Sequence, residues 1–195
     1  MFDTQTGYGW VSRVIHWLMA ISIVAMFALG LWMRDLDYYS PYYKTAPDIH
    51  KGVGIFLLGL LVVRLAWRAL NRKPSHGGVS VLEQRASTFV HWVLYPLLFL
   101  LMVSGYLIST ADGRAINVFG LFSVPSVITQ KGLEAIAGQI HYYTAFVVIA
   151  IASAHALAAL YHHFFKRDDV LRSMTVGGGQ KAVRRVPSEI PQSLK

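Results

Sequence analysis

Four long segments of the chain are apolar nearly throughout, rather than on one face only. Each has about 20 residues or more, which is enough for a helix to cross a hydrocarbon layer of roughly 30 Å. A water-soluble domain of this size would show amphipathic periods in such segments. The pattern therefore predicts an all-α membrane protein, a four-transmembrane-helix bundle with helices over about 11–33, 50–71, 86–109 and 139–165.

The remaining residues join and follow these helices. Residues 1–174 are predicted to form one transmembrane domain. Residues 175–195 are predicted to be a basic, flexible cytoplasmic tail, because three glycines at 177–179 precede lysines, arginines and prolines. Residues 127–137, in the longest loop, are predicted to form a short surface helix. The first apolar segment is longer than the core of a secretion signal and ends without a small-residue cleavage site, so we expect it to be retained.

Basic residues concentrate at one end of the predicted helices. Of the 18 lysines and arginines, 12 lie at the start of the first helix, around the loop between the second and third, or after the fourth, whereas 5 lie on the opposite side. The positive-inside rule then predicts that both termini face the cytoplasm. The net charge of +8 follows from this bias, so it indicates contact with anionic lipid headgroups and gives no reason to expect a nucleic-acid partner.

Four histidines are spaced so that they can face one another in pairs. His141 and His155 are 14 residues apart in the fourth segment. On a helix their side chains project within about 40° of each other and lie about 21 Å apart along the axis. In an antiparallel bundle His16 lies at the depth of His155, and His50 at the depth of His141. Two imidazole pairs at different depths are what two haem groups need, and the absence of cysteine excludes thioether attachment.

These histidines also have other readings. Hydrogen bonds between helices, or a surface position at the two helix starts, would account for them without a cofactor. A metal-ion site is a further alternative, although no Asp, Glu or Cys joins them at ligand spacing. Three glycines in phase with the histidines favour haem, because a flat ring needs room beside a backbone. They are Gly30, Gly54 and Gly105.

Arg64 is a charged residue within the second apolar segment. It follows His50 by 14 residues and should lie near the cytoplasmic-side pair. A guanidinium inside a membrane needs an anionic partner, which haem propionates would supply. The alternative is that Arg64 extends to the inner headgroups. Iron held by two imidazoles has both axial positions filled, so such a haem exchanges electrons and does not activate a ligand.

Five short motifs together resemble the bacterial cytochrome b561 family, from about Tyr8 to Met174. They are residues 12–17 (SRVIHW), 49–54 (IHKGVG), 64–68 (RLAWR), 140–141 (IH) and 154–163 (AHALAALYHH). The resemblance implies a multi-pass protein of the bacterial inner membrane with two haem b groups. It implies that His16 and His155 bind the inner haem, and His50 and His141 the outer haem.

The resemblance also implies a reaction. The best-defined enzyme of the family is superoxide oxidase, a superoxide:ubiquinone oxidoreductase that oxidises superoxide on the periplasmic side and reduces ubiquinone. Lys51, beside His50, would then attract the superoxide anion locally. His162 or His91 would hydrogen-bond the quinone near the inner haem; the alternative for both is an interfacial histidine. The rival function is a cytochrome b subunit of a hydrogenase or dehydrogenase complex, docked to a redox-enzyme partner. A homodimer is a further possibility for the assembly.

Overall fold

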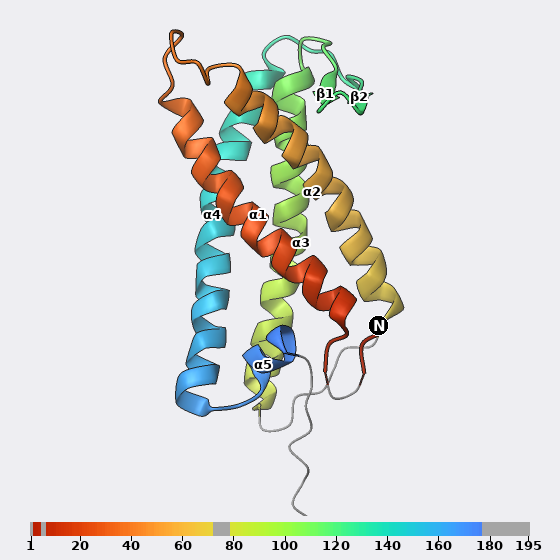
Figure 1. Ribbon diagram of the computed structural model, residues 1–195, viewed down its shortest axis with the longest axis vertical. Helices are drawn as coiled ribbons and strands as arrows, with labels where there is room; N and C mark the ends of the chain where they lie inside the picture. Colours follow the sequence, from red (N-terminus) through yellow and green to blue (C-terminus); the bar gives the residue numbers. More distant parts are fainter. Residues whose placement is uncertain (1, 5–6, 72–78, 177–195) are drawn as a thin grey trace, which may run out of the picture.

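The computed structural model describes residues 2–4, 7–71 and 79–176 (Figure 1). Within them, four helices are long and apolar enough to cross a membrane: α1 (Trp10–Arg34), α2 (Thr45–Leu70), α3 (Val81–Thr110) and α4 (Leu133–Tyr161). The predicted four-helix membrane bundle is confirmed. Most of the predicted tail lies outside the described residues.

Several helix ends differ from the predicted ones. The helix α2 begins at Thr45 and α3 at Val81, each five residues before its predicted start. At α3 the reason is a capping box: the Ser80 hydroxyl accepts a hydrogen bond from the Glu83 N–H at 3.3 Å, and the Glu83 carboxylate accepts one from the Ser80 N–H at 3.1 Å. Such a cap contributes about 1 kcal/mol to the stability of a helix.

The predicted surface helix over residues 127–137 is wrong in its first half. Residues 127–132 are not helical, and α4 itself begins at Leu133. The residue before it, Gly132, has φ +88°, a left-handed conformation that glycine adopts without strain and that breaks the helix there.

A small antiparallel hairpin in this loop was not predicted. Its strands are β1 (Ile116–Val118) and β2 (Phe122–Val124), with Ile116 opposite Val124. Phe119 in the turn has φ +54°, and its ring fits against Gly52 of α2 so closely that an added Cβ there would lie 2.6 Å from it. The same ring stacks on Phe56, with centroids 6.0 Å apart. These contacts fasten the hairpin to the start of α2.

The opposite end of the bundle is closed by two short elements that follow α4. The π-helical turn η1 (His162–Lys166) leads to the short helix α5 (Val170–Thr175). Helix α5 is tied back to α1, because Arg13 donates to the Thr175 carbonyl at 2.9 Å and Trp17 to the Met174 carbonyl at 2.8 Å. The start of α1 and helix α5 therefore lie together at one end, the α5 end, away from the hairpin end (Figure 1).

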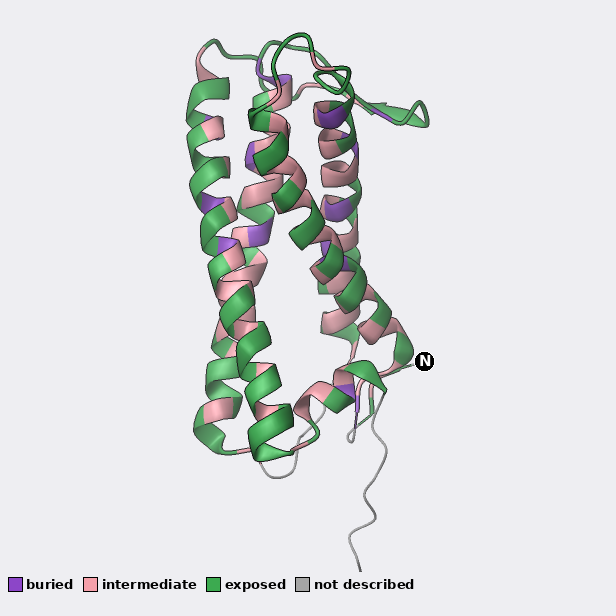
Figure 2. Cartoon of the chain, turned by 60° about the vertical axis from the view of Figure 1, so that its left-hand side comes forward, coloured by how far each residue is buried: buried purple, intermediate pink, exposed green. Residues whose placement is uncertain are grey.

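Few side chains of the bundle are fully buried. One residue from each long helix forms the central core: Met19, Leu61, Leu98 and Val148. Most of the helix surface is exposed, and many of its large side chains are apolar (Figure 2). In water such a surface would be unstable, whereas in a bilayer it faces lipid tails.

Candidate functional site

The structure brings the four spaced histidines together in two pairs. At the α5 end, His16 of α1 and His155 of α4 have ring centroids 6.4 Å apart with planes at 80°. At the hairpin end, His50 of α2 and His141 of α4 have centroids 6.2 Å apart with planes at 73°. A bond from a metal to an imidazole nitrogen is about 2 Å long, so two imidazoles across one metal have centroids about 6 Å apart. Both separations fit that arrangement.

Two glycines lie directly against the hairpin-end pair. A Cβ added at Gly30 would be 3.2 Å from Cε1 of His50, and one added at Gly105 would be 2.9 Å from Cε1 of His141. Each glycine therefore lets an imidazole approach a neighbouring backbone more closely than another residue would. Gly54, also predicted to make room, has no described protein atom within 4 Å of an added Cβ, so no neighbour requires glycine there.

The ring nitrogens of the hairpin-end pair differ in their partners. Nδ1 of His141 donates to the Leu101 carbonyl at 2.8 Å, with the Ser104 hydroxyl 3.4 Å away. This bond leaves Nε2 as the unprotonated nitrogen, and a metal-ligating histidine commonly donates its second N–H in this way. Nδ1 of His50 is buried and has no hydrogen-bond partner among the described residues. A buried polar atom without a partner is costly, which suggests that another group completes this site.

The α5-end pair has two further polar neighbours. Arg64 donates from Nη2 to Nδ1 of His16 at 3.0 Å, so its guanidinium is bonded inside the bundle and does not extend to the headgroups. His91 was predicted as a quinone contact. The centroid of its ring lies 5.0 Å from that of His155, and Nδ1 of His91 donates to the Ser87 carbonyl at 2.6 Å. His91 is therefore part of the surroundings of this pair.

His162 belongs to a separate group of charged side chains at the α5 end. Its Nδ1 donates to the Asp168 carboxylate, and its Nε2 lies 3.8 Å from Glu83, which is itself paired with Lys166. Sequence reasoning missed Asp168 and Glu83. A signal existed for Glu83, because Ser80 and Glu83 have the spacing of a capping box. Asp168 gave none, since only the fold brings it to His162.

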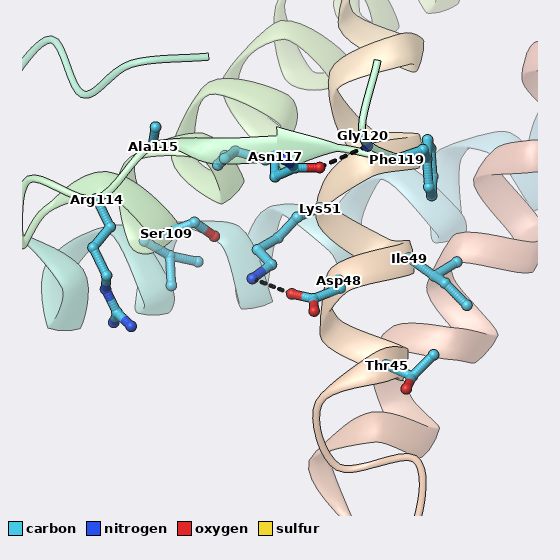
Figure 3. A pocket seen from close by; sticks show the side chains of 12 residues that line it. Thr45, Asp48, Ile49, Lys51, Ser109, Arg114, Ala115, Asn117, Phe119 and Gly120 are labelled. Atoms are coloured by element: carbon cyan, nitrogen blue, oxygen red, sulfur yellow. Dashed lines mark hydrogen bonds and ion pairs between the residues drawn. The ribbon is translucent and has the colours of Figure 1, made fainter. Parts of the chain in front are cut away.

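Lys51 lies at a pocket of about 600 Å³ between α2, the end of α3 and the hairpin (Figure 3). Its ammonium is paired with Asp48 at 2.7 Å. Arg114 lines the same pocket and is paired with Asp112, where hydrogen bonds from Arg114 lower the pKa of the carboxyl group. Sequence reasoning missed the pocket because it missed the hairpin that forms one wall.

In the described part of the chain, no three His, Cys, Asp or Glu side chains are grouped so that they could hold a metal ion. Comparison with known proteins indicates which family the chain belongs to. The family model described as prokaryotic cytochrome b561 matches residues 7–177. The chain belongs to the prokaryotic cytochrome b561 family.

Individual relatives agree with this assignment. The chain is 44% identical over 177 residues to cytochrome b561 homolog 2 of Escherichia coli strain K12, which covers 88% of this chain and 93% of that protein. It is 26% identical to cytochrome b561 homolog 1 of the same organism, over 82% of this chain and 92% of that one. It is 28% identical to a probable superoxide oxidase CybB of Yersinia pestis, over 82% and 90% respectively.

Family and fold together define the general role. The chain is a multi-pass bacterial membrane protein that transfers electrons, and its family implies b-type haem as the cofactor. The residues present fit such a group: imidazoles face each other at the required separation, glycines make room beside the hairpin-end pair, and a buried ring nitrogen of His50 has no partner in the described part of the chain.

The close contact at Gly105 can be tested. We expect Gly105→Ala to displace the His141 ring, because the new Cβ would lie 2.9 Å from it, and to lower the amount of haem bound per polypeptide. Gly59→Ala is the matched control, since an added Cβ there meets no described atom within 4 Å. Haem content of the purified variants, with helix content from circular dichroism, measures the effect. Normal haem content in Gly105→Ala would contradict it.

Proposed function

We propose that the chain binds two b-type haems and carries electrons across the membrane, from superoxide on the periplasmic side to ubiquinone near the cytoplasmic side. His16 and His155 would hold one haem, and His50 and His141 the other. The observation that carries the proposal is the pair of facing imidazoles found at each end of one bundle, with centroids 6.4 and 6.2 Å apart.

Haem held by these imidazoles would supply a one-electron carrier. The protein's own side chains hold and orient the ligands. The hydrogen bond from His141 to the Leu101 carbonyl fixes the ring and leaves Nε2 free to ligate. Arg64 brings a positive charge to His16, and we expect its guanidinium to pair with the propionates when haem is bound.

The hairpin end suits a small anionic donor. The pocket at this end is lined by two cations, Lys51 and Arg114 (Figure 3), and Lys51 follows the proposed haem ligand His50 directly in the sequence. Because both are paired with aspartates, they would attract an anion locally without a broad positive field. The similarity to a probable superoxide oxidase supports superoxide as that anion.

The reaction balances with quinone as the acceptor. Two superoxide anions each lose one electron and leave as dioxygen, and a quinone takes the two electrons together with two protons to become a quinol. His162, at the α5 end, is the proposed proton donor to the quinone, because its Nε2 makes no hydrogen bond to any described residue and its side chain is 12% exposed.

Counting haem tests the proposal directly. The pyridine haemochromogen of pure protein should show two b-type haems per polypeptide. Removing one imidazole of a pair, by His50→Ala or His16→Ala, should leave one haem, whereas the exposed His163→Ala should leave two. A count of zero in the wild-type protein would overturn the proposal. Purification with a tightly bound redox-enzyme subunit would favour the rival role as a subunit of a larger complex.

The charge of Lys51 tests the donor. We expect Lys51→Glu to slow reduction of the haem by superoxide about threefold at low ionic strength, because it reverses the charge at the pocket, and to leave the haem spectrum unchanged. Lys44→Glu is the control, since it makes the same change in net charge at an exposed residue outside the pocket lining. Rapid mixing with superoxide gives the bimolecular rate. Equal rates for both variants would reject a local role for Lys51.

His162 tests the acceptor side. Replacing it by alanine should slow oxidation of the reduced haem by ubiquinone roughly tenfold or more, since a positioned proton donor is lost. Both haems should remain, because His162 belongs to neither facing pair. The neighbouring His163→Ala serves as control. Loss of haem in His162→Ala would instead make the residue structural.

A further inference from the structure

Four charged or titratable side chains meet at the α5 end, apart from the two histidine pairs. His162 and Lys166 come from η1, Glu83 from the first turn of α3, and Asp168 from the residues before α5. A π turn closes over five residues, so His162 and Lys166 return to the same side and both meet Glu83. Three segments far apart in sequence therefore supply one cluster.

Both carboxylates of this cluster are held by the start of a helix. One oxygen of Glu83 accepts hydrogen bonds from the Ser80 N–H and hydroxyl at 3.1 and 2.8 Å, and the other faces Lys166 and His162. One oxygen of Asp168 accepts from the Val170 N–H at 3.1 Å, and the other accepts from Nδ1 of His162. If either carboxylate turned away from the cluster, it would lose its hydrogen bonds to the start of the helix.

The four side chains also form a gradient of exposure. His162 and Asp168 are 12% and 11% exposed, whereas Glu83 and Lys166 are 29% and 37% exposed. Glu83 lies 3.8 Å from Nε2 of His162, beyond hydrogen-bond distance, so this nitrogen remains available to a further group. The cluster thus extends from water at Lys166 and Glu83 to a half-buried imidazole.

We propose that this cluster delivers the protons of quinone reduction, with Asp168 as a positioning residue and with Glu83 and Lys166 forming its water-exposed side. The inference rests on the proposed function, in which a quinone is reduced at the α5 end. Asp168 would hold the Nδ1 proton of His162 and stabilise its charged form, so that Nε2 gives its proton to a quinone oxygen. Water at the exposed side of the cluster, beside the carboxylate of Glu83, would then return a proton to Nε2. Two such transfers, with two electrons, convert one quinone to one quinol.

The test uses full-length protein loaded with haem, reduced without oxygen, and then mixed with a short-chain ubiquinone or with ferricyanide. Ferricyanide takes electrons without protons, so it reports electron transfer alone. The variants are Asp168→Asn and Glu83→Gln, which keep the capping acceptor oxygens. The control is Asp169→Asn, the same change at the neighbouring residue, which is exposed and makes no side-chain capping bond.

We expect Asp168→Asn to slow haem oxidation by ubiquinone about tenfold or more and to increase the rate difference between H₂O and D₂O. Its haem spectrum and its rate with ferricyanide should match those of the wild type, as should every property of Asp169→Asn. Glu83→Gln should show the same quinone defect, and it provides the test if Asp168→Asn does not fold.

Two results would overturn the inference: an unchanged rate with ubiquinone, or an equal loss of rate with ubiquinone and ferricyanide. Failure of the proposed function looks different. In that case the wild-type haem itself would be oxidised by ferricyanide but not by ubiquinone.

Discussion

A polar group inside a membrane has no water to bond with, and this constraint explains where the bundle places its internal polar side chains. The lipid-facing surface is apolar over all four long helices, so imidazoles and a guanidinium must find partners within the protein. Arg64 and His141 do so, one near each end of the bundle, whereas Nδ1 of His50 has no partner among the described residues. A cofactor bound by the imidazoles would satisfy the same requirement. The b-type haem that the family implies is such a cofactor.

The two ends of the bundle offer different surroundings. At the hairpin end, Gly30 and Gly105 make room for the imidazoles, and paired charges line a small pocket. At the α5 end, Arg64 bonds to His16, and His162 belongs to a separate charged cluster. A small anion as donor and a proton-consuming acceptor suit these two ends in that order.

The sequence predicted the parts of this fold that depend on composition and spacing. Four apolar segments specify four membrane helices, and the 14-residue interval between His141 and His155 places them at two depths. The hairpin was missed because it depends on contacts between distant residues, such as Phe119 against Gly52, whereas the start of α3 had a local signal in the capping box of Ser80 and Glu83. The meeting of His162 with Asp168 was missed because a π turn and a left-handed Arg167, with φ +55°, redirect the chain between them.

The central core has an electrical consequence. Met19, Leu61, Leu98 and Val148 form an apolar layer, with His141 and His155 on either side of Val148 along α4. Such a layer offers a proton no hydrogen-bonded relay, whereas an electron can tunnel through it. An electron moving between the two proposed haems would therefore cross part of the bilayer unaccompanied by positive charge. Carried inward across the full membrane, each one would work against the cell's voltage by about 2.3 kcal/mol per 100 mV, so turnover would help to charge the membrane.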